Sequence, residues 1–120
     1  MAKTPAMNFY AADWLRDPDL KMATFGTKGI WIDMLCHMWF ANPQGKLKGT
    51  PDEICRLVGC GKLELSQFLD ENKRLKFCNV QICNGIVTLI NRRMYAAWKD
   101  KELTRQRVRK HRKKEDETEL

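Results

Sequence analysis

The apolar positions of residues 25–41 are so dense that they predict one long helix with a wide hydrophobic arc. Its core-facing stripe is expected at six positions: Phe25, Gly29, Ile32, Leu35, Cys36 and Trp39. Four further residues widen the arc beyond one buried face: Trp31, Met34, Met38 and Phe40. An uncovered arc of this kind usually marks an interface, so these four predict a homo-oligomer, most simply a two-fold dimer. The alternative is that Phe9, Tyr10 and Trp14 cover the arc within one chain.

Residues 50–75 carry the pattern of two short helices joined by a turn. Thr50 is a suitable N-cap, Pro51 occupies the first helical position, and Glu53 completes a capping box. The turn contains two glycines, within residues 59–61. Two short helices around a glycine-containing turn predict a helix-turn-helix.

A β-hairpin is predicted to follow, because Asn84-Gly85 separates two β-prone runs and suits the positive φ angles of a type I′ turn. This turn places Val80 opposite Leu89, so that the apolar side chains of both strands lie on the same face of the hairpin and can be buried together. Residues 46–48 are expected to add a third strand. The whole order predicts a mainly α fold with a small β-hairpin (α+β), a winged helix-turn-helix with a C-terminal basic helix.

Charge divides the 120 residues into two parts. Residues 1–91 carry eleven Lys and Arg against nine Asp and Glu, whereas residues 92–114 carry eleven against two. The sequence therefore predicts a winged domain over residues 1–98 and a basic extension over residues 99–120. The extension ends in an acidic cluster: Glu115, Asp116, Glu117 and Glu119.

Such concentrated basicity predicts DNA, duplex or single-stranded, as the partner. The second helix of the helix-turn-helix would be the recognition helix, with five candidate contacts: Lys62, Ser66, Gln67, Lys73 and Arg74. Its outward carboxylates, Glu64, Asp70 and Glu71, cancel its cations and make it a poor surface for phosphates. The basic segment supplies the remaining candidates: Arg92, Arg93, Arg105, Arg107, Arg109, Lys110, Arg112, Lys113 and Lys114. Because its cations repel one another, residues 105–114 are expected to be frayed until a polyanion binds.

Five cysteines raise the possibility of a structural zinc site, because Cys55-x4-Cys60 repeats the spacing of Cys78-x4-Cys83. Zinc sites favour a C-x2-C spacing, so buried, reduced thiols are the preferred interpretation and no metal or cofactor is predicted. No catalytic grouping is evident among the remaining residues, which predicts a protein that is not an enzyme. The sequence has neither an 18-residue apolar run nor a secretory signal, and this predicts a cytoplasmic protein without a membrane partner.

Three segments resemble the N-terminal winged-helix domain of phage replisome organisers and DnaD-like primosomal proteins: GIWIDMLCHMW at residues 29–39, GKLKGTPDEI at 45–54 and NGIVTLINRRM at 84–94. The resemblance covers about residues 8–98. It implies a non-enzymatic DNA-binding and assembly module of replication initiation, with other replication proteins as further partners. Two alternatives stay open, namely a protein–protein oligomerisation module and a sequence-specific winged-helix transcriptional regulator.

Overall fold

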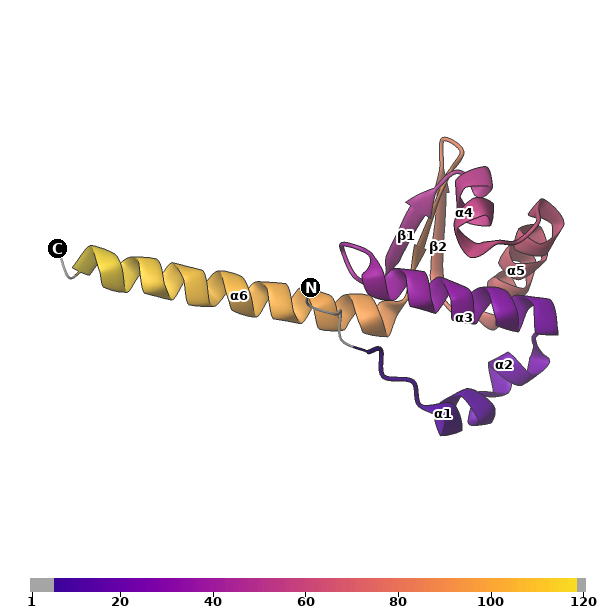
Figure 1. The fold of residues 1–120 in the computed structure, drawn as a ribbon, viewed down its shortest axis with the longest axis horizontal. Helices are drawn as coiled ribbons and strands as arrows, with labels where there is room; N and C mark the ends of the chain where they lie inside the picture. The colour runs from indigo at the N-terminus through magenta and orange to yellow at the C-terminus, as the bar shows by residue number, and fades with distance from the viewer. Residues whose placement is uncertain (1–5, 119–120) are drawn as a thin grey trace.

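The computed structural model describes residues 6–118, which form a mainly helical α+β fold with a three-stranded antiparallel sheet. Along the chain the elements are α1 (Ala11–Arg16), α2 (Pro18–Met22), α3 (Phe25–Phe40), β1 (Lys46–Gly49), α4 (Pro51–Val58), α5 (Lys62–Leu75), β2 (Asn79–Cys83), β3 (Ile86–Ile90) and α6 (Arg92–Thr118). In Figure 1 the elements from α1 to β3 gather into one body, and α6 projects far beyond it. Among the described residues, no helix is long and apolar enough to cross a membrane.

The predicted start and end of α4 are confirmed. The Thr50 hydroxyl accepts from the Glu53 amide, and the Glu53 carboxylate accepts from the Thr50 amide, both at 3.2 Å. Two amides that the helix itself leaves without a partner are thereby satisfied. Gly59 ends the helix with a left-handed backbone at φ +82°.

The hairpin and its register are also confirmed. Asn84 and Gly85 have φ angles of +53° and +76°, as a type I′ turn requires. Val80 pairs with Leu89 between β2 and β3, and β1 pairs with the other edge of β3, giving the order β1-β3-β2. Leu89 is fully buried, so this register turns the apolar face of β3 toward the helices.

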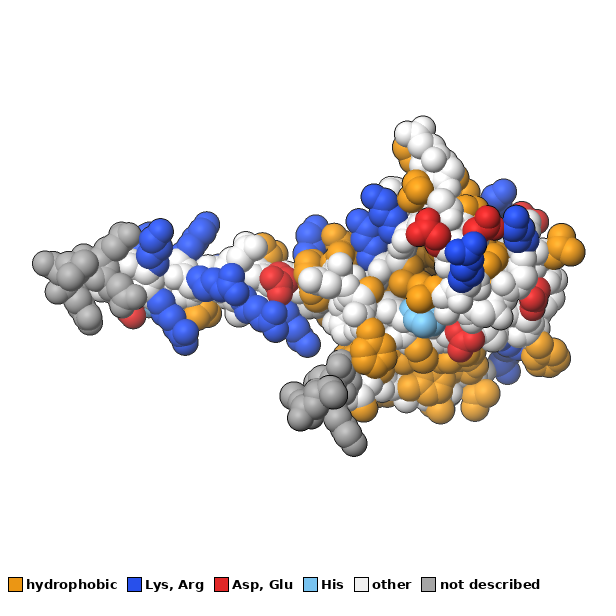
Figure 2. Space-filling model, turned by 45° about the horizontal axis from the view of Figure 1, so that its top comes forward, with side chains coloured by type: hydrophobic (Ala, Val, Ile, Leu, Met, Phe, Trp, Pro, Cys, Tyr) orange, Lys and Arg blue, Asp and Glu red, His pale blue; other side chains and the backbone are white. Residues whose placement is uncertain are grey.

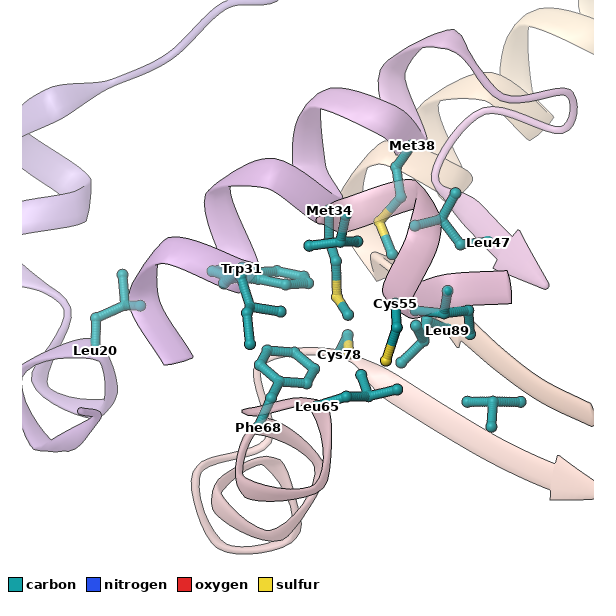
Figure 3. Close-up of a cluster of buried hydrophobic side chains, with 14 residues drawn as sticks. Leu20, Trp31, Met34, Met38, Leu47, Cys55, Leu65, Phe68, Cys78 and Leu89 are labelled. Atoms are coloured by element: carbon teal, nitrogen blue, oxygen red, sulfur yellow. The ribbon is translucent and has the colours of Figure 1, made fainter. Parts of the chain in front are cut away.

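The hydrophobic core lies between α3, α4, α5 and one face of the sheet. In Figure 3, Trp31 and Met34 on α3 lie close to Phe68 on α5. The ring of Trp31 stacks on Phe68 and on Phe77, with centroids 6.2 and 6.1 Å apart. These contacts pack α3 against α5 and against the connection between α5 and β2.

This core corrects the assignment of faces on α3. Trp31, Met34 and Met38 were expected between copies of the chain, but they are buried within one chain, Met34 and Met38 completely. Of the four expected interface residues only Phe40 is on the surface, where 70% of it is exposed. The stripe expected in the core is exposed or half-buried: Phe25, Gly29, Ile32, Leu35, Cys36 and Trp39. Because α3 is apolar nearly all round, its periodicity does not select one face.

A buried carboxylate joins α5 to the start of α3. Glu71, expected on the outward face of α5, is instead buried. It accepts hydrogen bonds from the Thr24 amide at 2.7 Å, from the Thr24 hydroxyl at 2.9 Å and from the Thr27 hydroxyl. Burial alone would raise the pKa of Glu71, but the hydrogen bonds from Thr27 and Thr24 outweigh it, aided by the Arg74 charge, and hold the pKa below its usual value. The negative charge also complements the positive end of the α3 dipole.

Replacing this carboxylate is expected to destabilise the fold. Glu71→Gln should lower the free energy of unfolding at pH 7 by about 1–3 kcal/mol, because an amide cannot accept from all three donors as a carboxylate does. Because the folded pKa is depressed, the stabilisation by Glu71 is full above its unfolded pKa of about 4.3 and is lost as the pH falls through the folded pKa. Urea unfolding at about pH 7 and pH 3 measures both effects.

The neighbouring exposed carboxylate provides the control. Asp70 lies 3.9 Å from the Lys73 ammonium at the surface, so Asp70→Asn should change the stability by less than about 0.5 kcal/mol. The role of Glu71 is contradicted if the two variants unfold at the same urea concentration at both pH values.

Candidate nucleic-acid interface

The base of α6 is fixed to the body of the protein. Asn91 caps the helix by accepting from the Met94 amide at 3.0 Å, and its own amide donates to the Gly45 carbonyl at 2.8 Å. Gly45 itself has φ +89° and lies against the first turn of α6. Met94 packs against the core. The start of α6 is therefore held by the loop between α3 and β1, and its direction is set by the body.

Arg92, a predicted DNA contact, binds the body of the protein. Its guanidinium donates to the Asn79 side-chain oxygen at 3.0 Å and to the Lys76 carbonyl at 3.3 Å. Lys76 is the C-cap of α5, so the cation also meets the negative end of that helix dipole. Arg93, beside it, is exposed. Arg92 thus orients the start of α6 against the α5–β2 connection.

The basic segment is helical, which corrects the expectation of a frayed segment. α6 continues to Thr118, and residues 103–115 are all exposed. Arg, Lys and Gln favour helices, and contacts with carboxylates flank the cationic run. Glu102 binds Arg105 at 2.8 Å, and His111 lies 3.0 Å from Glu115. Figure 2 shows Lys and Arg side chains distributed along the projecting helix.

The acidic end lies mostly outside the part of the chain that the structure describes. The side chains of Asp116 and Glu117 and the whole of Glu119 lie outside the described residues, so only the side chain of Glu115 is placed.

The seven cations of residues 105–114 cover more than half of the helix circumference and leave one side to Val108 and His111. At 3.6 residues per turn, these ten residues make nearly three turns and rise about 15 Å. An α-helix with its side chains is about 10–12 Å wide, which matches the roughly 12 Å major groove of B-DNA with phosphates on both of its edges. The same cations also follow the backbone of a single strand. This arrangement suits a polyanion that runs along α6.

The candidate contacts on α5 are all exposed but lie close to carboxylates. Lys62 binds Asp52 of α4 at 3.2 Å, and Lys73 lies 3.9 Å from Asp70. Arg74 is close enough to Glu71 to lower the pKa of that carboxyl. Ser66 and Gln67 are exposed between these pairs, and the tail of α6 points away from α5 in Figure 1. The structure therefore does not join the two predicted sets of contacts into one surface.

The cysteines are arranged in a way that contradicts a four-thiolate zinc site. Cys78 directly precedes β2 and Cys83 ends it, so the two residues are about 16 Å apart at the rise of an extended chain. Four sulfurs around one zinc, each at about 2.3 Å, need to lie much closer together. Burial raises the pKa of the Cys78 thiol to about 12. In the described part of the chain, no three His, Cys, Asp or Glu residues converge on a possible metal position.

Sequence reasoning missed a pocket of about 370 Å³ at the base of α6. Its lining residues are Trp39, Ala41, Asn42, Gln44, Trp98, Lys101, Glu102 and Arg105. The four from α6 follow the i, i+3, i+4, i+7 spacing of one helix face, and this spacing was visible in the sequence. The contribution of α3 and its following loop was not, because it depends on how the two segments pack.

Comparison of the chain with family models, curated proteins and solved structures finds no match. The resemblance to replisome organisers therefore stays a prediction from three short segments. The functional assignment depends on the charges and contacts of the described residues.

Proposed function

We propose that this protein is a non-enzymatic DNA-binding protein of the replisome-organiser type, and that it binds nucleic acid chiefly along α6. The observation that carries this proposal is the run of seven cations without a carboxylate on an exposed, projecting helix. One or two basic residues suffice to complement a helix dipole, whereas seven suit repeated phosphate contacts. Arg supplies four of them, and its guanidinium fork matches phosphate oxygens.

In this proposal the body is a winged helix-turn-helix, with α4 and α5 as the helix pair and the β2–β3 hairpin as the wing. Its support is the element order and the register of the sheet. The ion pairs of Lys62 and Lys73 weaken α5 as a surface for phosphates, which favours contact through α6 over a transcriptional regulator that reads an operator through α5. The body then positions α6 and contacts other replication proteins.

Two variants with the same change of net charge test this proposal. One carries Lys62→Gln, Lys73→Gln and Arg74→Gln on α5, and the other carries Arg107→Gln, Lys110→Gln and Lys113→Gln on α6. Three lost phosphate contacts should make the salt dependence of duplex binding shallower by about 2.7 and weaken binding about tenfold or more in the α6 variant. The α5 variant should keep the salt slope of the original chain to within about 0.5. Fluorescence anisotropy with a labelled random-sequence duplex measures both quantities.

An equal or larger loss in the α5 variant would contradict contact through α6. Because both variants remove two lysines and one arginine, a non-specific effect of net charge would weaken binding equally in both. Only a difference between them locates the bound DNA.

The second candidate function is self-assembly, which the exposed apolar residues at the N-terminal side favour. Large apolar side chains are exposed before and along α3, among them Phe9, Tyr10, Leu15, Phe25 and Phe40. Figure 2 shows apolar side chains gathered on the lower side of the body. We propose a second copy of this chain as the occupant, joined through an isologous two-fold interface that includes Phe40. Sedimentation at micromolar concentration should give twice 14.1 kDa, and a species of 14.1 kDa contradicts it.

A further inference from the structure

The pocket at the base of α6 combines two tryptophans with two cations and the carboxylate of Glu102. Trp39 comes from the last turn of α3, and Trp98 comes from the second turn of α6. Lys101 and Arg105 follow Trp98 on the same face of α6. The pocket is a depression of about 370 Å³ that is open to solvent.

Both tryptophans are attached to rigid parts of the fold. The ring of Trp98 stacks on Tyr95, with centroids 6.0 Å apart and an angle of 18° between the planes. The backbone of Tyr95 in turn lies against Gly45, where α6 packs closely on the loop before β1. The Trp39 carbonyl accepts from the Gln44 side-chain nitrogen at 2.9 Å, which ties the loop to the end of α3. The Trp98 ring is therefore held against Tyr95, and the loop beside Trp39 is held against the end of α3, before a ligand arrives.

The polar residues around the tryptophans complete the chemistry of a nucleotide site. The Asn42 side chain is exposed at the loop, where its amide can bond a base edge. Lys101 is exposed on the helix side, and Arg105 is paired at 2.8 Å with Glu102, a carboxylate of the same pocket that offsets part of its charge. Aromatic rings stack on the face of a base, an amide hydrogen-bonds to a base edge, and cations bind phosphate.

We propose that this pocket accepts one unpaired base of a nucleic-acid strand whose backbone continues along α6. Arg105 belongs both to the pocket and to the cationic run, so the strand passes directly from one to the other. In a duplex the bases are paired and stacked, and taking one out costs about a few kcal/mol. The pocket therefore gives the protein a preference for DNA with unpaired bases. This inference rests on the proposed function, because it presupposes that α6 binds the backbone.

Variants of Trp98 test the pocket with two probes of equal length, an oligo(dT) single strand and a fully paired duplex. Trp98→Ala should weaken binding of the single strand by about 5- to 150-fold, the equivalent of about 1–3 kcal/mol for one stacked base. Binding of the duplex should change less than about twofold. The substitution should leave the salt slope of each probe unchanged, because the slope reports phosphate contacts. Trp98→Phe keeps an aromatic face and should recover most of the single-strand affinity.

The outcomes separate this inference from the proposed function. If the original chain binds neither probe, the proposed function fails. If it binds both and Trp98→Ala weakens them equally or not at all, the pocket is not a base site although α6 still binds DNA.

A measurement on the unaltered chain covers the case in which Trp98→Ala does not fold. The indole N–H resonances of Trp39 and Trp98 should shift on addition of oligo(dT), whereas that of the core residue Trp31 should not. Unchanged Trp39 and Trp98 resonances at saturating oligo(dT) overturn the inference.

Discussion

Removal of residues 107–120 is expected to abolish most of the salt dependence of DNA binding. If about five cations of the tail contact phosphates, log K of the intact chain should fall with log salt at a slope of about −4.5 on duplex and about −3.5 on single strands. Between about 50 and 200 mM salt, the duplex slope corresponds to an affinity loss of about 500-fold. After the deletion the slope should be shallower than about −1, because the sixteen Lys and Arg that remain are interspersed with eleven Asp and Glu instead of forming one run.

The deletion should leave the body intact. Residues 107–115 are exposed, and the buried core of the described residues ends before α6 leaves the body. The melting temperature should therefore change by no more than about 2 °C. Deletion of residues 115–120 alone is the matched control, because it shortens the chain but keeps every cation of the run, and its slope should be at least as steep as that of the intact chain. If the chain without residues 107–120 binds DNA as tightly as the intact chain and with the same salt dependence, α6 is not the DNA-binding element.

Gly45→Ala is expected to have the largest effect on stability. At φ +89° an alanine costs about 1–2 kcal/mol, and its Cβ would lie 2.6 Å from the Tyr95 amide nitrogen. Backbone atoms cannot turn aside as a flexible side chain does, so the loop or α6 has to move, at a further cost of about 1–3 kcal/mol. We expect a total loss of about 3 kcal/mol in urea unfolding, together with displacement of the base of α6.

Gly29→Ala gives the control for this prediction. Gly29 is exposed within α3, and a Cβ there meets no other atom within 4 Å. Alanine favours a helix over glycine by about 0.5–1 kcal/mol, so this variant should be slightly more stable than the original chain. Equal stability of the two variants would contradict the close packing of Gly45 on α6.

The features that the sequence predicted well are those with local causes. The capping box of Thr50 and Glu53 needs only neighbouring residues, as does the turn at Asn84-Gly85. The hairpin turn then determines the pairing of Val80 with Leu89 without further information. The same holds for the basic tail, since its charge is a property of composition.

The features that the sequence did not predict depend on packing between distant segments. α3 is apolar nearly all round, so only its contacts with Phe68 and Phe77 show that Trp31 faces the core. Glu71 resembles an ordinary surface carboxylate until Thr24 and Thr27 are placed beside it. The pocket between Trp39 and Trp98 requires both the loop after α3 and the exit of α6. Local patterns contain no information about these contacts.

The most direct measurement of where DNA binds is a map of backbone amide shifts on titration with DNA. With a short duplex, the amides of residues 103–114 on α6 should shift together and saturate at one equivalent, while those of Lys62–Leu75 on α5 stay nearly unchanged. With oligo(dT), the shifts should extend to the pocket around Trp39 and Trp98. Shifts concentrated on α5 and the β2–β3 hairpin, with α6 unaffected, would contradict binding along α6.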